Sequence, residues 1–161
     1  YPPAVGFVFD KECLSDSDIE ALKRRKPHPI EFIKRRMYEN YLLHPDAIAF
    51  VLNQEDRERE QSVAGEEVRE WLETNKSNND YFPKNPTQQE LSNPQWVDEN
   101  IDAAKLLGIL FDKFSEARVE FRKTKHSVML TEWLLENNPN CFAELVQFLQ
   151  RILDAGKAAV S

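Results

Sequence analysis

Two carboxylates directly follow a short apolar run near the start of the chain. Gly6–Phe9 leads into Asp10, and Glu12 lies two residues further on. Side chains two apart on a strand share one face of a sheet. At the carboxyl end of a parallel strand they point into the crevice where α/β proteins bind ligands. Carboxylate oxygens are hard ligands, so this spacing suggests a site for Mg²⁺ or Mn²⁺. A charged strand end before a capped helix is the alternative interpretation.

A third carboxylate, Glu39, lies just after a second short apolar run, in the segment Arg36–Leu43. If the two runs are neighbouring strands, Glu39 can meet Asp10 and Glu12 across the strand ends. The alternative is an exposed glutamate between two aromatic residues that pack on the core, with Asn40 satisfying backbone groups in the turn.

Three further side chains that could take part in catalysis lie close together in the last third of the chain: Lys123, Lys125 and His126. A lysine beside a metal-bound phosphate stabilises charge that develops on the transferred oxygens. His126 could instead carry a proton. A basic turn between two helices explains the same residues, and the spacing alone favours that simpler interpretation.

Positive charge is concentrated in residues 23–36. This window carries a net charge of +6 in a chain of net charge −7, which leaves −13 for the remainder. Such a patch can direct a phosphate backbone to one place. A solvated helix end and loop would account for it equally well. The basic side chains are Lys23, Arg24, Arg25, Lys26, Lys34, Arg35 and Arg36.

The elements that must position these groups begin with a strand–helix–strand unit. Val5–Phe9 is predicted to be a short buried strand. Ser15 can cap a helix that Pro27 ends, and Pro29–Ile33 is predicted to be a second strand. A strand, a helix and a strand in this order imply a right-handed crossover and a parallel sheet.

The remainder of the chain has mainly helical periodicity. Pro45 can open a helix, and Val63–Leu72 is predicted to form another. Thr74–Pro94, with three prolines and many polar residues, is predicted to be a long loop.

Three helices are predicted to follow this loop. Ile101–Phe121 has the pattern of one long amphipathic helix, and Val128–Leu135 that of a second. The third is Phe142–Leu153, closed by Gly156. Its apolar residues are expected to face inward: Leu145, Val146, Phe148, Leu149, Ile152 and Leu153.

We therefore expect an α/β fold with a partial parallel sheet of few strands, followed by a mainly helical C-terminal region, and predominantly α overall. Residues 1–53 would form the α/β unit. Residues 54–99 would form a polar helix and a long loop, and residues 100–161 a helical region packed on the unit.

Composition excludes several classes of protein. A chain of 161 residues with 41% apolar and 30% charged residues is typical of a soluble globular domain. No apolar run approaches the roughly 20 residues that cross a bilayer, so no membrane association is expected. Cys13 and Cys141 are far apart, which favours reduced thiols in a cytoplasmic protein.

Other familiar sites are not indicated. His28, His44 and His126 lack the spacing of a zinc site. The chain has neither a G-x-x-x-x-G-K-[ST] loop nor a G-x-G-x-x-G turn, so it binds no nucleotide by those devices. The tryptophans Trp71, Trp96 and Trp133 are expected in the core or in an interface.

Gly6–Glu12, Leu14–Ile19 and Ile33–Pro45 resemble the second half of a TOPRIM domain. The closest resemblance is to OLD-like proteins, in which an AAA/ABC-type ATPase precedes the nuclease domain. In that family one strand ends in D-x-D, and the next leads into a segment like R-x-x-E-N-Y-L-L-x-P. The resemblance covers Val5 to about Leu52. It continues more loosely through 104–107 and 121–126.

The resemblance implies a metal-dependent nuclease that acts on DNA in phage defence or DNA maintenance. Asp10 and Glu12 match its D-x-D metal ligands, Glu39 matches the acid of its E-N-Y-L-L segment, and Lys125 or Lys123 would be its catalytic lysine. Mg²⁺ or Mn²⁺ would be the cofactor. The basic window would position the DNA backbone without reading bases. An N-terminal ATPase region of the same protein would be a partner, and a homodimer is compatible with this assignment.

Two departures from the family pattern limit this expectation. The second acid, Glu12, is one methylene longer than the aspartate of the family. The first TOPRIM strand would precede Tyr1, so we expect an incomplete metal site and weak or no nuclease activity in this chain alone. The alternative is a non-catalytic helical interaction or regulatory module of an AAA-type ATPase. A phosphate-binding domain without chemistry is a third interpretation.

Overall fold

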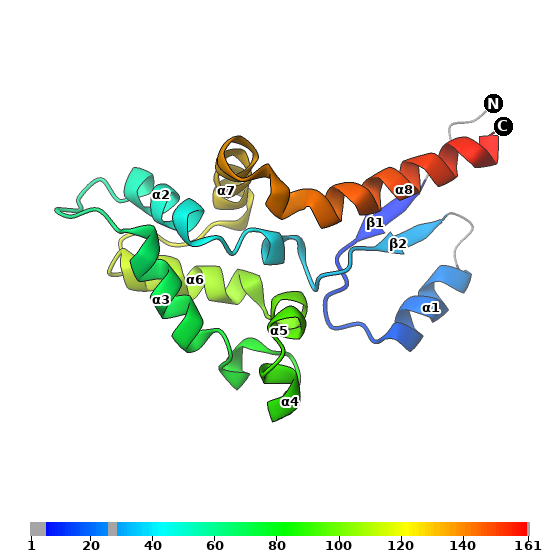
Figure 1. Ribbon diagram of the computed structural model, residues 1–161, viewed down its shortest axis with the longest axis horizontal. Coiled ribbons are helices and arrows are strands. Elements are labelled where there is room, and N and C mark those ends of the chain that lie inside the picture. Colours follow the sequence, from blue (N-terminus) through cyan, green and yellow to red (C-terminus); the bar gives the residue numbers. More distant parts are fainter. Residues whose placement is uncertain (1–5, 26–28, 161) are drawn as a thin grey trace.

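A small parallel sheet lies at one end of a mainly helical molecule. The computed structural model describes residues 6–25 and 29–160 (Figure 1). Strand β1 (Phe7–Phe9) pairs in parallel with β2 (Ile30–Phe32), with Phe7 opposite Ile30 and Phe9 opposite Phe32. Helix α1 (Asp16–Arg25) lies between the two strands in the chain. The expected strand–helix–strand unit with parallel strands is therefore confirmed.

Helix α1 begins at the predicted cap. The Ser15 hydroxyl accepts a hydrogen bond from the amide of Asp18 (3.2 Å), and the Asp18 carboxylate accepts one from the amide of Ser15 (3.1 Å). This reciprocal arrangement satisfies two amides that have no partner inside the helix. The hydrogen bonds from Ser15 also lower the pKa of Asp18. The expected strand start at Val5 and helix end at Pro27 lie outside the described residues, as do Lys26 and His28.

The prediction that β1 is buried is wrong. Phe7, Val8 and Phe9 are 45%, 40% and 48% exposed. A sheet of two strands is too narrow to bury both of its faces, and within the described residues little packs on β1. The rings of Phe7 and Phe9 lie 6.1 Å apart, and Phe9 is 6.1 Å from Phe32, so these aromatic side chains mainly cover one another.

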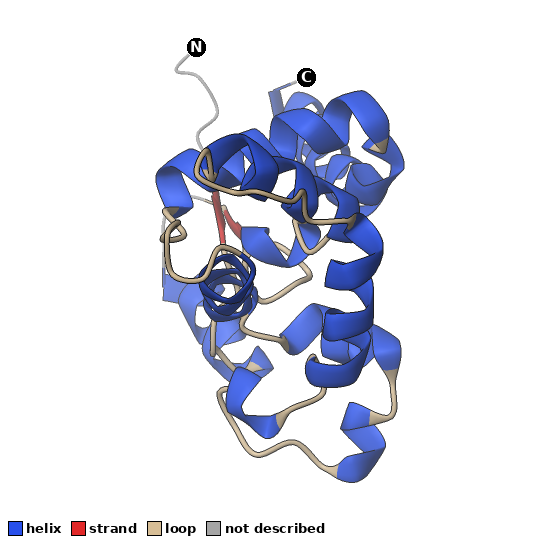
Figure 2. Ribbon diagram, turned by 90° about the vertical axis from the view of Figure 1, so that its left-hand side faces the viewer, coloured by secondary structure: helices blue, strands red, loops and turns tan. Residues whose placement is uncertain are grey.

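The regular structure in the rest of the described chain is helical, with loops between the helices, as Figure 2 shows. The 3₁₀ turns are η1 (Tyr38–Tyr41), η2 (Asn79–Tyr81) and η3 (Pro139–Phe142). The helices are α2 (Pro45–Glu55), α3 (Gly65–Asn75), α4 (Gln88–Leu91), α5 (Pro94–Asn100), α6 (Ala103–Phe114), α7 (Lys123–Asn137) and α8 (Ala143–Val160). Pro45 opens α2, as predicted. The molecule is thus predominantly α with a two-stranded parallel sheet.

One hydrophobic core joins all three predicted segments of the chain. It runs from Ile33 after β2 to Phe142 in η3, and its centre lies among α2, α3, α6 and α7. Leu52, Val68 and Leu130 are fully buried there. In α6 the apolar residues recur at three- and four-residue steps, so they form a stripe that faces this core.

Helices α2 and α3 approach each other closely at their first turns. A side chain at Gly65 would place its Cβ 1.8 Å from Oδ1 of Asp46, which itself forms an ion pair with Arg69 at 3.6 Å. A Cβ at this point would require the Asp46 side chain to move and would still lie 3.2 Å from the Asp46 Cα.

The predicted long helix over 101–121 is shorter in the structure. Helix α6 ends at Phe114, because Glu116 and Ala117 adopt left-handed backbone with φ of 51° and 61°. The apolar periodicity continues past this break, since Phe121 packs back onto the core from the following loop. Its ring lies 5.2 Å from that of Phe111.

The expected loop over 74–94 also contains regular structure. Besides η2, it includes α4, which begins in a capping box. The amide of Glu90 donates to the Thr87 hydroxyl (3.2 Å), and the Glu90 carboxylate accepts from the amide of Thr87 (2.8 Å). These bonds satisfy first-turn amides of a helix that is only four residues long.

Helix α8 ends later than predicted, and part of the face that was predicted to point inward is exposed. It continues past Gly156 to Val160, and Figure 1 shows it reaching beyond the helical body beside the sheet. Val146 and Leu153 are each 59% exposed and Leu149 is 40% exposed. The inward face was therefore predicted wrongly at these three positions, which lie outside the shared core. No described helix is long and apolar enough to cross a membrane.

Candidate active site

Hydrogen bonds join the end of β1 to the segment that carries Glu39. Oδ1 of Asp10 accepts a hydrogen bond from the amide of Tyr38 at 3.0 Å. Two residues later, the amide of Glu12 donates to the carbonyl of Arg36 at 2.6 Å. The two strand ends therefore lie side by side, as the parallel pairing requires. Asp10 is consequently close to the residue that precedes Glu39.

Asp10 and Glu12 do not share a strand face, which corrects the prediction. Strand β1 stops at Phe9, and the chain enters a turn in which the amide of Leu14 donates to the carbonyl of Lys11 (3.1 Å). Glu12 has a φ of 50° and is exposed. The period-two alternation of a strand thus ends before it reaches Glu12.

Glu39 is the most buried of the three predicted acids, with 1% of its surface exposed. It lies in η1, which turns it toward the first turns of α7. Lys123 Nζ lies 3.3 Å from its Oε2, and the Ser127 hydroxyl donates to Oε1 at 3.5 Å. Lys123 and Ser127 are four residues apart on α7 and so share one helix face. Oε2 accepts no hydrogen bond from any residue that the structure describes.

Lys125 and His126 meet a different carboxylate, Glu55 at the end of α2. Lys125 forms an ion pair with Glu55, and Nε2 of His126 lies 3.3 Å from the same oxygen. Nδ1 of His126 accepts from the amide of Arg122 at 2.8 Å, so the ring proton is on Nε2 and donates to Glu55. Burial lowers the pKa of His126, and the hydrogen bond from Lys125 lowers that of Glu55.

Glu55 was missed in the sequence, although the lysine spacing contained a signal. Residues two apart on an α-helix are separated by about 200° around its axis. Once α7 is known to begin at Lys123, Lys123 and Lys125 must face different partners.

Most of the basic window is neutralised by ion pairs. Lys23 lies 3.1 Å from Glu31, and Lys34 lies 2.9 Å from Glu99. The contact with Glu99 raises the pKa of Lys34.

The arginines of this window have three different environments. Arg35 lies over the ring of Tyr41, 4.4 Å from its centre, with its Nε 3.7 Å from Glu144. Arg36 is buried. Arg24 and Arg25 are exposed and form no ion pair with a described residue. The window therefore does not form one continuous cationic patch.

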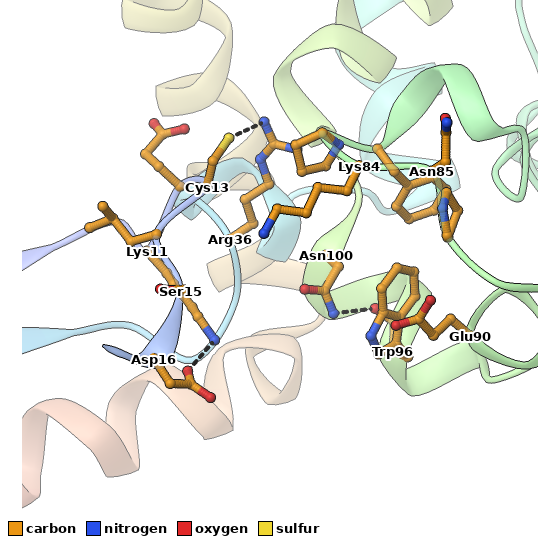
Figure 3. A pocket seen from close by; sticks show the side chains of 15 residues that line it. Lys11, Cys13, Ser15, Asp16, Arg36, Lys84, Asn85, Glu90, Trp96 and Asn100 are labelled. Carbon is orange, nitrogen blue, oxygen red and sulfur yellow. Dashed lines mark hydrogen bonds and ion pairs between the residues drawn. The ribbon is translucent and has the colours of Figure 1, made fainter. Parts of the chain in front are cut away.

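Arg36 lies at the wall of a pocket of about 420 Å³, shown in Figure 3. Its Nη2 is 3.5 Å from both Cys13 Sγ and Asp102 Oδ2. The opposite wall includes Phe82 and Trp96, which come from the predicted loop and from α5. Sequence reasoning missed this pocket because nothing in the residue pattern brings these segments together.

Comparisons with protein-family models, with curated proteins and with solved structures found no match to this chain.

The three predicted metal ligands have unequal surroundings. Asp10 commits one oxygen to the amide of Tyr38, and Glu12 lies on an exposed turn. Glu39 alone presents a buried oxygen without a hydrogen bond from another described residue. Within residues 6–25 and 29–160, no three His, Cys, Asp or Glu side chains form a group that could hold a metal ion. Glu39 is therefore the most buried of the three acids, and its Oε2 has the Lys123 ammonium as its ionic partner.

Proposed function

We propose that this chain contributes acidic and basic residues to a TOPRIM-type, divalent-metal-dependent DNA nuclease of the OLD-like kind, coupled to an ATPase region of the same protein. The observation that supports this most directly is the pairing of buried Glu39 with Lys123 at 3.3 Å. Oε2 of Glu39 has the Lys123 ammonium at 3.3 Å but accepts no hydrogen bond from a described residue, and a buried carboxylate short of hydrogen bonds costs free energy. Such a group is expected where a further cation completes its surroundings.

The residues take distinct roles in this proposal. Glu39, with Asp10 hydrogen-bonded to the adjacent residue Tyr38, would hold Mg²⁺ or Mn²⁺, which would supply charge neutralisation at the scissile phosphate. Glu12 would assist from its turn. Lys123 is the preferred catalytic lysine because it faces Glu39, whereas Lys125 faces Glu55.

The exposed arginines Arg24 and Arg25 would contact the DNA backbone without reading bases. Lys23, Lys34 and Arg35 have acidic partners in the chain. These three would contribute to binding only after exchanging those partners for phosphates.

Manganese binding tests the assignment of Glu39. We expect Glu39→Gln to weaken Mn²⁺ binding by about tenfold or more, because the amide is neutral. Glu55→Gln is the matched control: it makes the same change in a carboxylate that also pairs with a lysine, and it should leave binding unchanged. Isothermal titration calorimetry measures both. If neither Glu39→Gln nor Asp10→Ala alters Mn²⁺ binding, the metal assignment is wrong.

DNA cleavage by the protein with its ATPase region tests the lysine. Lys123→Ala should lower the cleavage rate by roughly 10²-fold or more, as expected for loss of a group that stabilises transition-state charge. Lys125→Ala removes an equally exposed lysine one half-turn away and should have a much smaller effect. The reverse order would reassign the catalytic role to Lys125.

A second candidate is a non-catalytic interaction module of an AAA-type ATPase. It is favoured by one observation, the exposed apolar side chains on α8 and β1. In that case calorimetry with Mn²⁺ should show no heat above background. A domain that only binds phosphate groups would instead retain DNA without metal and release it as salt rises.

A further inference from the structure

The pocket beside Arg36 has the size and the unused donors of a ligand site. Its volume of about 420 Å³ falls within the range of small-molecule pockets, which begins near 300 Å³. The turn after β1 and the start of α1 form one wall, and the segment that follows Tyr81, with α4 and α5, forms the other. Figure 3 shows side chains from both walls converging on the same space.

Arg36 is the unexplained group in this pocket. Its side chain is 9% exposed, and neither Nε nor Nη1 has a hydrogen-bond partner within the part of the chain that the structure describes. Its contacts with Cys13 Sγ and Asp102 Oδ2, both 3.5 Å, are long. Buried donors without acceptors are costly. An anionic oxygen in the pocket would accept from them.

The pocket lining contains a second cation. Lys84 comes from the opposite wall, and Figure 3 shows its side chain and that of Arg36 at the same pocket. Lys84 forms no ion pair with any residue in the described ranges.

Three acids, Asp16, Glu90 and Glu12, line the pocket together with its cations. Asp16 pairs with Lys11 at 3.2 Å, and Glu90 accepts from the amide and hydroxyl of Thr87. Glu12 is exposed on its turn. Arg36, whose paired oxygen on Asp102 is 3.5 Å away, and Lys84, whose charge also acts on Asp18, are the two cations that a bound anion would contact.

The same pocket has an aromatic wall. Phe82 and Trp96 lie 5.4 Å apart at an angle of 28° and are both half-buried. The side-chain amide Nδ2 of Asn100 donates to the backbone carbonyl of Trp96 at 2.8 Å, at the end of α5. Aromatic faces beside a cationic site suit a ligand that combines a planar ring with a phosphate.

We infer that this pocket binds a nucleotide unit, with its phosphate at Arg36 and Lys84 and its base against Trp96. The inference goes beyond the proposed nuclease, because it requires neither a metal ion nor cleavage. The phosphate and base can come from a free mononucleotide or from the 5′ end of a DNA strand.

Calorimetry with deoxyadenosine monophosphate tests the inference. Deoxyadenosine has the base but no phosphate, and inorganic phosphate has no base. Each should bind at least about tenfold more weakly than the monophosphate. Arg36→Gln should weaken binding of the monophosphate by about tenfold or more, and Lys84→Gln by about fivefold. Lys157→Gln, which neutralises an exposed lysine on α8 outside the pocket, should leave it unchanged.

A short single strand with and without its 5′ phosphate identifies the source of the ligand. Tighter binding of the phosphorylated strand than of the mononucleotide assigns the pocket to strand ends, and equal binding assigns it to free nucleotides. Absence of binding, or binding that Lys84→Gln leaves unchanged, overturns the inference even if Arg36→Gln does not fold. Glu39→Gln should not affect this binding, so failure of the nuclease proposal can be distinguished.

Discussion

His126 is a buried imidazole held among charged groups. Its neighbours are the carboxylate of Glu55, the ammonium of Lys125 and the amide of Arg122. Burial is the largest influence and lowers the pKa of His126 below the ordinary value of about 6.5. In the window between this lowered pKa and about 6.5, the unfolded chain binds more protons than the folded one. His126 therefore contributes stability above pH 6.5 that is lost as the pH falls through this window.

Urea unfolding at about pH 7.5 and about pH 5.5 measures this effect, since carboxylates titrate mainly below that range. The free energy of unfolding should fall on acidification, and His126→Gln should reduce the fall. Burial also lowers the pKa of His44, so the double variant with His44→Gln should show the smallest dependence. An unchanged pH dependence in His126→Gln would show that His126 does not titrate as described.

Single residues differed in how far the sequence could predict their surroundings. The approach of Asp10 to the Glu39 segment followed from two parallel strands ending at one edge of a sheet. The choice between Lys123 and Lys125 depended on where α7 begins, and the sequence has no strong cap there: Arg122 provides no side-chain hydrogen bond. The pairing with Glu55 required knowledge of how α2 packs on α7.

The end of α6 is stabilised by backbone hydrogen bonds at a conformational cost. The amide of Ala117 donates to the carbonyl of Asp112 at 2.8 Å while Ala117 has a φ of 61°. An L-residue in this conformation costs about 1 kcal/mol or more, which glycine avoids. We expect Ala117→Gly to raise the free energy of unfolding by about 0.5–1 kcal/mol.

Chemical denaturation of Ala117→Gly and of Ala155→Gly compares the same substitution in two backbones. Ala155 is an exposed residue of α8, where glycine should cost about 1 kcal/mol. Destabilisation at both positions would argue that the turn after α6 has no strain for glycine to relieve.

Among the secondary-structure elements, the first residues of helices were easier to predict than the last. Ser15 and Pro45 are side-chain signals for helix starts, and the structure follows both. Thr87 and Glu90 form a similar signal that polar composition obscured. The end of α6 has no such signal, because the left-handed residues are Glu116 and Ala117 instead of glycine or asparagine. Apolar periodicity continued across the break and predicted one helix where the chain forms a helix and a loop.

The whole molecule combines a well-packed helical body with a thinly covered sheet. Leu107, Leu110 and Phe111 of α6 are fully buried, whereas all three residues of β1 are exposed. The sheet unit is joined to the body partly through the hydrogen bonds of Asp10 and Glu12. We expect amides of β1 to exchange with solvent much faster than those of α6, because few apolar contacts oppose their opening.

Hydrogen exchange followed by NMR checks this difference. Leu110→Ala should lower the free energy of unfolding by about 2–5 kcal/mol and increase exchange throughout the body. Phe9→Ala should change global stability much less. Equal protection of β1 and α6 would show that the sheet and the helical body open as one unit.

Helix α8 has a consequence for how the molecule moves in water. Its 18 residues correspond to about 27 Å of helix, and part of that length lies beyond the helical body. The chain should therefore sediment more slowly than a sphere of equal mass. A partner that fills the space beside α8 and β1 would add mass with little added drag, so the frictional ratio would fall on binding.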